Sequence, residues 1–327
     1  MKTILISSAI VLSAVSLAAS AEEASTSFSW GDVTFQPRAY AGYADYELKS
    51  GIFNIDLTYP DGSTASGTGP ATLDFFGHDK LQFSGLIGGV GGTVAYGQFF
   101  GDLYYQSTAN IDAYSGQQQT FDNNGFIFDQ NLSDVNAQHA DWAISLGYRV
   151  TEQWSVFAGY KYGKTEWDQT FQQNVPPPDS SLIANGSLNG EFKQDGPFIG
   201  TSYSFLIGPG ALTFKAAYAY LDGTYTWDSP EVLYPPFSGS ADSIGDTLQW
   251  KLDGNSNAYA LGISWTQSLA NNLGISIGAN YHNYRFDMSG TRSATLEGNT
   301  PISSGQVSGG TLTEDLFTLT ASVLYTF

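Results

Sequence analysis

The chain ends in the stretch FTLTASVLYTF, residues 317–327, which alternates apolar and mostly polar residues up to its last position. Phe317, Leu319, Ala321, Val323, Tyr325 and Phe327 occupy every second place. Because successive side chains of a β-strand point to opposite faces, this spacing predicts a strand with one continuous apolar face. Most chain ends carry polar residues and fray, whereas this face runs to the terminal carboxylate. Either a protein core or lipid must therefore cover it.

The beginning of the chain has the pattern of a secretory signal peptide. Lys2 precedes an apolar run over residues 4–17, and the small residues Ala19-Ser20-Ala21 stand before two glutamates. This order of a charged start, an apolar middle and a small-residue cleavage site predicts removal of residues 1–21. Residues 22–327 contain no further apolar run long enough for a helical membrane span. We therefore expect an exported chain with one domain over residues 22–327.

Composition narrows the class of protein. The chain has no cysteine, so a disulfide framework is excluded. It holds 37 glycines, 20 tyrosines and 21 phenylalanines, while only 13% of its residues are charged. This profile favours strands and tight turns over helices. The formal net charge of −19 argues against nucleic acid as a partner, because the phosphate backbone would repel the chain.

Alternating segments recur along the chain in pairs. Residues 142–150 and 154–163 both alternate, and only the three residues TEQ separate them. Further pairs lie at 199–205 and 212–220, and at 259–265 and 273–281. Counting outward from these pairs predicts ten strands. Connections after the even-numbered strands are short, and those after the odd-numbered strands run roughly 25 to 30 residues.

The regular alternation of short and long connections distinguishes two all-β architectures. In an up-and-down meander, odd and even connections lie at opposite ends, so one end has tight turns and the other has five long loops. That asymmetry is typical of an outer-membrane barrel with short periplasmic turns and long external loops. A soluble sandwich would explain the alternation but neither the sorted connections nor the many Gly, Ala and Ser residues on the second face. The sequence thus predicts a transmembrane antiparallel β-barrel of about ten strands in the outer membrane of a Gram-negative bacterium.

A barrel that lies in lipid must be closed. An open sheet edge in lipid would leave N–H and C=O groups unsatisfied, so the last strand must pair with the first. The apolar face of residues 317–327 then lies against acyl chains. We expect outer-membrane lipid and lipopolysaccharide as partners. The acidic loops either repel anionic lipopolysaccharide or bind divalent cations that bridge to it, and both alternatives stay open. We also expect Phe327 to mediate contact with the barrel-assembly machinery.

Several stretches resemble the omptins, a family of ten-stranded outer-membrane proteases. They are EFKQDGPFIGTSYSF at 191–205, LTFKAAYAYLDGTYTW at 212–227, WKLDGNSNAYALGISWTQSLANNLGISIGANYHNYRF at 250–286 and LFTLTASVLYTF at 316–327. The resemblance covers most of residues 140–327. It implies ten strands and an active site at the outer rim, with an aspartate pair in the second external loop and an Asp-x-His pair in the fourth.

These catalytic elements are not intact in this chain. Asp129 matches the first aspartate, but Asn131 stands where the second is expected, and residues 222–254 contain no histidine. General-base catalysis of the omptin kind needs such an imidazole near the attacking water. We therefore expect no omptin-type protease activity. Asp129, His78 and His282 remain weak candidates for a rearranged rim site.

Charged residues on the second strand faces predict the content of the lumen. They are Arg38, Asp102, Asp141, Arg149, Lys161 and Lys215. Buried charges persist when they are paired, so we expect a salt-bridge network that closes and braces the barrel. A selectivity lining of a narrow channel is the alternative. No residue cluster has metal-ligand spacing, and we expect neither a metal nor a cofactor.

Three functional classes follow from these expectations. The first is a structural, adhesive or ligand-binding barrel that displays acidic, aromatic-rich loops, with Trp167, Tyr225 and Trp227 among the loop aromatics. The second is a narrow porin-like channel for small solutes, and the third is a hydrolase with a rearranged rim site. The identity of an external ligand is open.

Overall fold

The computed structural model consists of antiparallel strands. It describes residues 33–70, 80–109, 111–114, 118–123, 126–174, 183–234, 244–270, 272–296 and 300–327. The expected signal peptide, residues 1–21, lies outside the described residues. Among the residues described, no helix is long and apolar enough to cross a membrane.

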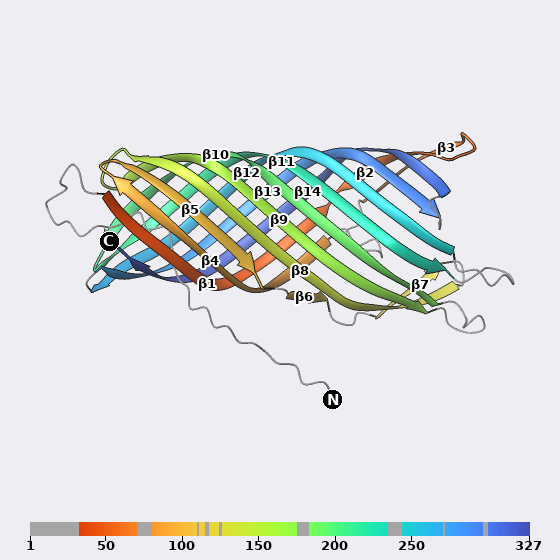
Figure 1. Ribbon diagram of the computed structural model, residues 1–327, viewed down its shortest axis with the longest axis horizontal. Helices are drawn as coiled ribbons and strands as arrows, with labels where there is room; N and C mark the ends of the chain where they lie inside the picture. Colours follow the sequence, from red (N-terminus) through yellow and green to blue (C-terminus); the bar gives the residue numbers. More distant parts are fainter. Residues whose placement is uncertain are drawn as a thin grey trace, which may run out of the picture.

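Ten strands form a closed ring (Figure 1). In ring order they are β1 (Val33–Ser50), β4 (Lys80–Tyr96), β5 (Phe99–Thr108), β8 (Phe126–Arg149), β9 (Trp154–Asn174), β10 (Ile183–Ile207), β11 (Gly210–Tyr234), β12 (Ile244–Ala270), β13 (Leu273–Leu296) and β14 (Thr300–Tyr325). The last strand pairs with the first from Arg38 opposite Leu324 to Ser50 opposite Leu312. The expected pairing of the terminal strand with the first strand is therefore confirmed.

Four shorter strands extend the ring at one end. β2 (Ile52–Thr58) follows β1 and pairs with β14, and β3 (Thr64–Pro70) pairs with β2. β6 (Ile111–Tyr114) and β7 (Gln118–Asn123) both pair with β8. They occupy the two connections that follow β1 and β5, so part of the expected long loops is sheet.

The opposite end carries the tight turns. Residues 97–98, 150–153, 208–209 and 271–272 link consecutive ring strands. Gly97, Gly208 and Asn272 have φ angles of 60°, 58° and 72°, a left-handed conformation that suits glycine and asparagine in short hairpins. The backbone N–H of Thr326 donates to the carbonyl of Asn272, so the carboxyl terminus lies at this end (Figure 1).

Strands β8 to β14 are longer than the alternating apolar segments suggested. They contain 21 to 27 residues, whereas about 9 to 11 tilted residues cross a hydrocarbon layer. The connection after β9 is accordingly residues 175–182 and that after β11 is residues 235–243. The strands continue beyond these segments because apolar and polar residues still alternate there. In this part the apolar residues point inward and the polar residues point outward.

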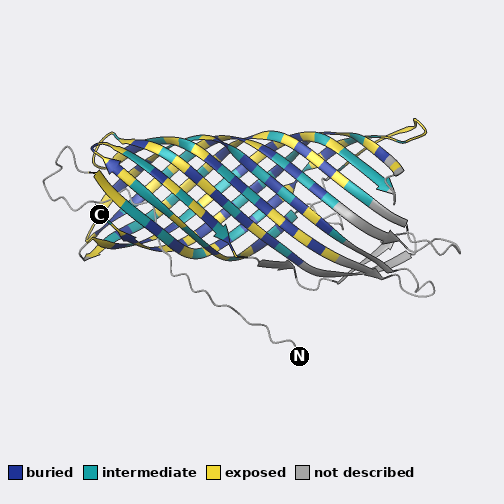
Figure 2. Cartoon of the chain, viewed as in Figure 1, coloured by how far each residue is buried: buried dark blue, intermediate teal, exposed yellow. Residues whose placement is uncertain are grey.

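Buried and exposed residues alternate along the ring strands (Figure 2), and the exchange of apolar and polar faces divides the barrel into two tiers. In the tier beside the tight turns, β9 exposes Trp154 and Tyr160 and buries Ser155 and Lys161. Farther along the same strand, Trp167 is 1% exposed inside the barrel, while charged residues stand outside. Trp167, Tyr225 and Trp227 are expected in loops, but they are buried in the interior, because the strands and their alternation of faces continue through these positions.

Candidate functional site: the closed lumen

An aromatic and aliphatic core fills the tier away from the tight turns. Side chains of strands around the ring take part, and Tyr46, Phe53, Trp167, Leu188, Phe192, Leu221, Tyr225, Trp227, Leu252 and Phe286 are all at most 2% exposed. The rings of Phe192 on β10 and Phe286 on β13 meet edge to face with centroids 5.0 Å apart. Two strands lie between β10 and β13 in the ring, so this contact crosses the interior.

Hydrogen bonds cross the lumen just beside this core. Thr165 Oγ1 on β9 donates to Tyr46 Oη on β1 at 2.8 Å. Gln194 Nε2 on β10 lies 2.9 Å from both carboxylate oxygens of Glu314 on β14. In each pair three ring strands separate the partners. These contacts tie opposite walls of the barrel together.

Asp141 is the centre of a buried polar cluster at the boundary between the tiers. Its Oδ2 accepts a hydrogen bond from Gln106 Nε2 at 2.9 Å and lies 3.3 Å from His139 Nε2 and 3.6 Å from Lys161 Nζ. His139 Nδ1 lies 2.8 Å from Thr165 Oγ1, which links the cluster to the cross-lumen bonds. Asp141 Oδ1 is buried without a hydrogen-bond partner among the described residues.

Lys161 connects this cluster to the far wall. Its Nζ donates to Tyr284 Oη at 2.6 Å and sits 4.7 Å from the centroid of the same ring. His282 Nδ1 lies 2.5 Å from Tyr284 Oη, so the hydroxyl joins the two nitrogens. Buried charges are stabilised by such partners.

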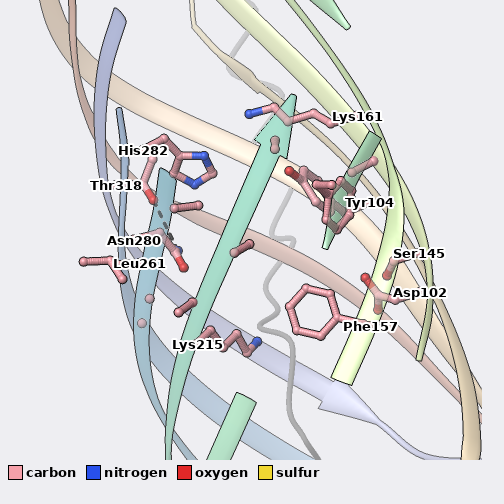
Figure 3. A pocket seen from close by; sticks show the side chains of 18 of the residues that line it. Asp102, Tyr104, Ser145, Phe157, Lys161, Lys215, Leu261, Asn280, His282 and Thr318 are labelled. Atoms are coloured by element: carbon pink, nitrogen blue, oxygen red, sulfur yellow. Dashed lines mark hydrogen bonds between the residues drawn. The ribbon is translucent and has the colours of Figure 1, made fainter. Parts of the chain in front are cut away.

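The remaining expected lumen charges lie nearer the tight turns. Arg38 and Asp102 form an ion pair whose side chains are 2% and 3% exposed, and Thr93 Oγ1 donates to Asp102 Oδ2 at 2.5 Å. Lys215 lines the same part of the lumen (Figure 3). Arg149 is half-buried at the end of β8, opposite Ser155. The structure thus brings Arg38 to Asp102 and Lys161 to Asp141, and places Arg149 apart from both pairs along the barrel.

A cavity of about 210 Å³ lies between the two groups of charges. Lys161 and His282 are at one end of it and Lys215 at the other, with Asn280 and Thr318 on one side and Phe157 on the other (Figure 3). Asn280 Nδ2 donates to Thr318 Oγ1 at 3.4 Å.

The weak catalytic candidates are not brought together by any described contact. Asp129 lies on β8 between Thr120 of β7 and Asn174 of β9, and its side chain is outside the described residues. His78 falls outside the described residues altogether. His282 is inside the barrel, against Tyr284. Within the described part of the chain, no group of three His, Cys, Asp or Glu residues could hold a metal ion.

An apolar belt surrounds the tier beside the tight turns. On β14 it includes Phe317, Leu319, Val323 and Tyr325, and it continues to Phe327 beyond the strand; these residues are 41–69% exposed, and Ala321 is exposed on the same face. Tyrosines mark its edge: the hydroxyls of Tyr160, Tyr218 and Tyr281 donate to Asp195, Asn257 and Asp315 just beyond it. Such aromatic residues with a polar tip are typical of membrane interfaces.

Beyond the belt the outer wall is charged. Glu191 contacts Lys164 at 2.9 Å and Lys193 at 2.5 Å, and Glu47 pairs with Lys49 and Lys80. Partial burial raises the pKa of Glu191, but hydrogen bonds and charges from both lysines outweigh it and hold that pKa below its ordinary value. At this level of the barrel the outer wall is polar and the interior is apolar, the reverse of the tier beside the tight turns.

Several residues of the lumen were not among those predicted from the sequence. His139, Thr165, Tyr284 and Glu314 form much of the cluster, and each lies on an inward strand face. Strand parity offers a signal for all four, because His139 shares a face with Asp141, Thr165 with Lys161 and Tyr284 with His282, and Glu314 lies on the face of β14 opposite Phe317. The contacts of Tyr284 with Lys161 and of Glu314 with Gln194 join strands distant in sequence, and no local pattern indicates those.

Comparison with known proteins bears on the fold. No protein-family profile and no curated protein sequence matches the chain. The structure is similar to the outer membrane protease OmpT from Escherichia coli, with a TM-score of 0.54, 12% identity, and coverage of 92% of this chain and 98% of that one. A Pseudomonas aeruginosa FadL homologue (TM-score 0.33, 13% identity, 90% of each chain) and the P. putida toluene transporter TodX (TM-score 0.29, 11% identity, 88% and 90%) are more distant. The chain therefore has an omptin-like outer-membrane β-barrel fold.

Proposed function

We propose that this chain is an outer-membrane barrel with a closed lumen, which acts as a rigid stalk and displays its loops outside the cell. The proposed role is structural, adhesive or ligand-binding. The short turns, the start of β1 and the carboxyl terminus would face the periplasm, and the polar tier would project from the membrane. Lipid and lipopolysaccharide would contact the outer wall, and Phe327 would serve recognition by the assembly machinery.

The belt supports the membrane location. Exposed large apolar side chains encircle one tier, among them Leu86 and Leu146, which are 72% and 74% exposed. Contiguous apolar surface of this extent is not stable in water. The closed ring satisfies the backbone groups of every ring strand at this level, as a hydrocarbon environment requires.

The burial of the interior side chains is the observation that supports the proposed role. The core at the polar tier is built from side chains of the strands themselves, and they are as buried as those of a soluble protein. A channel for solutes would need a continuous polar path through this tier. Catalysis at the His139–Asp141 pair would need substrate access, whereas these residues are 0% and 1% exposed.

Planar-bilayer recording on refolded protein, residues 22–327, tests the role. We expect no discrete conductance steps at any salt concentration, because the aromatic core blocks ion passage. Reconstitution is verified separately by flotation with vesicles. Steps whose size rises with salt concentration would show an open pore and contradict the proposal.

A peptide-cleavage assay separates the display role from the hydrolase alternative. We expect no cleavage of a fluorogenic peptide library by the reconstituted protein. Cleavage that is lost in His139→Gln, His282→Gln or Asp129→Asn would contradict the proposal and identify the residue responsible.

A further inference from the structure

One strand of the outer tier has a free edge. β2 pairs with β14 on one side and with β3 on the other, and β3 ends the series. Within the described part of the chain, no strand pairs with the second edge of β3. The hairpin of β2 and β3 projects beyond the ring strands at the end away from the tight turns (Figure 1). The free edge therefore lies at the end of the barrel that the proposed orientation places outside the cell.

This edge lacks the features that normally keep two sheets from joining. Natural edge strands carry charged residues, internal prolines or bulges. β3 has no charged residue, pairs with β2 without a bulge, and has its single proline, Pro70, at its last position. The residues from Thr64 to Thr68 are exposed, and a Cβ at Gly67 would meet no atom within 4 Å. An approaching strand would thus meet no charge on β3.

The hydrogen bonds of the hairpin show which backbone groups point to the free edge. The N–H of Tyr59 donates to the carbonyl of Ser63 at 2.9 Å, so these residues form a hydrogen-bonded pair of the ladder. Bonded and non-bonded pairs alternate along an antiparallel ladder. Odd-numbered residues of β3 therefore bond to β2, and even-numbered residues direct their backbone groups to the free edge. The even-numbered residues are Thr64, Ser66, Thr68 and Pro70, and the proline has no N–H.

These free groups are arranged symmetrically about Ser66. When two copies of β3 pair antiparallel with Ser66 opposite Ser66, Thr64 of each strand lies opposite Thr68 of the other. Each of these pairs would form two backbone hydrogen bonds, and cross-strand threonines stabilise a sheet further. The ladder would end where Pro70 meets Gly62 of the opposite turn. β3 is therefore complementary to a second copy of itself, as a twofold contact requires.

The symmetry of such a pair decides how the two barrels are oriented. The twofold axis that relates two antiparallel strands is perpendicular to their sheet. The hairpin of β2 and β3 continues the barrel wall along the long axis of the molecule, so this twofold axis is perpendicular to the barrel axis (Figure 1). Half a turn about it reverses the direction of the barrel. Two paired copies therefore point in opposite directions, as proteins of two facing membranes do.

We propose that β3 pairs with β3 of a second copy of this chain in the outer membrane of a neighbouring cell. The barrel then mediates contact between cells that carry the same protein. This inference rests on the proposed function, because it needs the tight turns in the periplasm and the polar tier outside. A single contact of this size is weak, and many copies on two facing surfaces strengthen it by multivalency.

Opposite charges at the symmetric position test the contact. In Ser66→Lys, and likewise in Ser66→Glu, like charges would lie directly opposite each other in a pair of copies. Two populations of Gram-negative cells without long surface polysaccharide produce the protein with different fluorescent labels, and flow cytometry counts mixed aggregates. We expect wild-type cells to aggregate, each variant alone to aggregate at least tenfold less, and a mixture of Ser66→Lys with Ser66→Glu cells to recover. Ser289→Lys, exposed on the outer wall of β13, is the matched control and should aggregate like the wild type.

Several outcomes would overturn the contact. Folding of each variant is checked by its heat-modifiable electrophoretic mobility in isolated outer membranes. The proposal is wrong if folded wild-type protein gives no aggregates, if either variant alone aggregates fully, or if the mixture of variants does not recover. Aggregation of producing cells with cells that lack the protein would identify a different partner and would equally refute it.

A cysteine at the same position separates this inference from the proposed function. The chain has no cysteine, so Ser66→Cys carries a single thiol. A membrane-impermeant maleimide should label it on intact cells, and absence of labelling would refute the proposed orientation of the barrel. Labelling of a folded protein that causes no aggregation would refute the β3 contact alone. A short thiol cross-linker should join two copies of Ser66→Cys but not of Thr64→Cys, and equal cross-linking would contradict the symmetric register.

Discussion

Asp141 shows how single residues decide the interior of the barrel. It lies at the boundary of the two tiers, where His139, Gln106 and Lys161 converge on one carboxylate oxygen. Removing one partner of a buried ion pair leaves the other charge without compensation. The free energy of unfolding should therefore depend more strongly on this buried ion pair than on an ion pair at the surface.

Asp141→Asn should destabilise the folded barrel by about 3 kcal/mol, because the Lys161 ammonium would remain buried without its carboxylate. Urea unfolding in lipid vesicles, followed by tryptophan fluorescence, measures the change. Asp222→Asn, at an exposed position of the outer wall, is the control and should shift the free energy of unfolding by less than about 0.5 kcal/mol. An unchanged midpoint for Asp141→Asn would show that the pair is dispensable.

Glu191 gives a prediction about pH. Its pKa in the folded state is lowered by Lys193 and Lys164 against the opposing effect of burial, so its ion pairs stabilise the fold above the unfolded pKa of about 4.3 and this contribution is lost as the pH falls below it. Glu191→Gln should therefore lower stability at pH 7 by less than about 1 kcal/mol, since the pair is partly solvated. The difference in urea midpoint between the variant and the wild type should be largest near pH 7 and shrink as the pH falls toward 3. A difference that does not shrink with falling pH would assign the effect to packing.

At the scale of the element, each long strand combines two opposite polarity patterns. β9 and β10 are apolar outside beside the tight turns and apolar inside farther on. Close packing at the inner face leaves specific positions without space for a side chain. A Cβ at Gly190 would lie 2.0 Å from Trp167 Cε2, so the indole rests directly on the β10 backbone.

Gly190→Val should displace the Trp167 indole and destabilise the fold by about 1–3 kcal/mol through overpacking. The change is read from the urea midpoint together with a red shift of the tryptophan emission. Gly67→Ala is the control, because a Cβ at that position of β3 meets no atom within 4 Å. Equal stability of the two variants would contradict the close contact.

Ala321→Arg tests which strand faces meet lipid. Ala321 is exposed in the middle of the belt on β14, so a guanidinium there should cost about 2–4 kcal/mol and lower the yield of folding into vesicles. Asn255→Arg introduces the same side chain on β12 beyond the belt, between Asp222 and Asp287, and should fold normally. Equal yields would place the belt outside the hydrocarbon.

At the scale of the whole molecule, different effects stabilise the two tiers. The belt tier is held by strand pairing in a medium without water, which makes local opening of the sheet costly. The outer tier is held by the hydrophobic core that crosses its lumen. Opening of one tier should therefore be separable from opening of the other.

Phe286→Ala removes a ring that is fully buried and contacts Phe192, and should destabilise the outer tier by about 3–5 kcal/mol. Hydrogen exchange in vesicles should accelerate in residues 187–193 and 284–290 and stay unchanged in residues 199–205 and 273–279. Leu269→Ala, at an exposed position near the tight turns, is the control. Uniform acceleration along β10 and β13 would show a single cooperative unit.

The sequence by itself determined the fold class, the alternation of tight and elaborate ends, and the pairing of residues 317–327 with the first strand, because these depend on a period of two and on the need to close a sheet in lipid. It also indicated which face of each belt strand carries charge. Only the tertiary structure decided that the strands continue through the presumed loops, that Trp167, Tyr225 and Trp227 are buried in the interior, and that Thr165 meets Tyr46 and Gln194 meets Glu314 across the lumen. In these last two pairs three ring strands separate the partners, and such contacts depend on strand register and tilt, which no short-range pattern encodes.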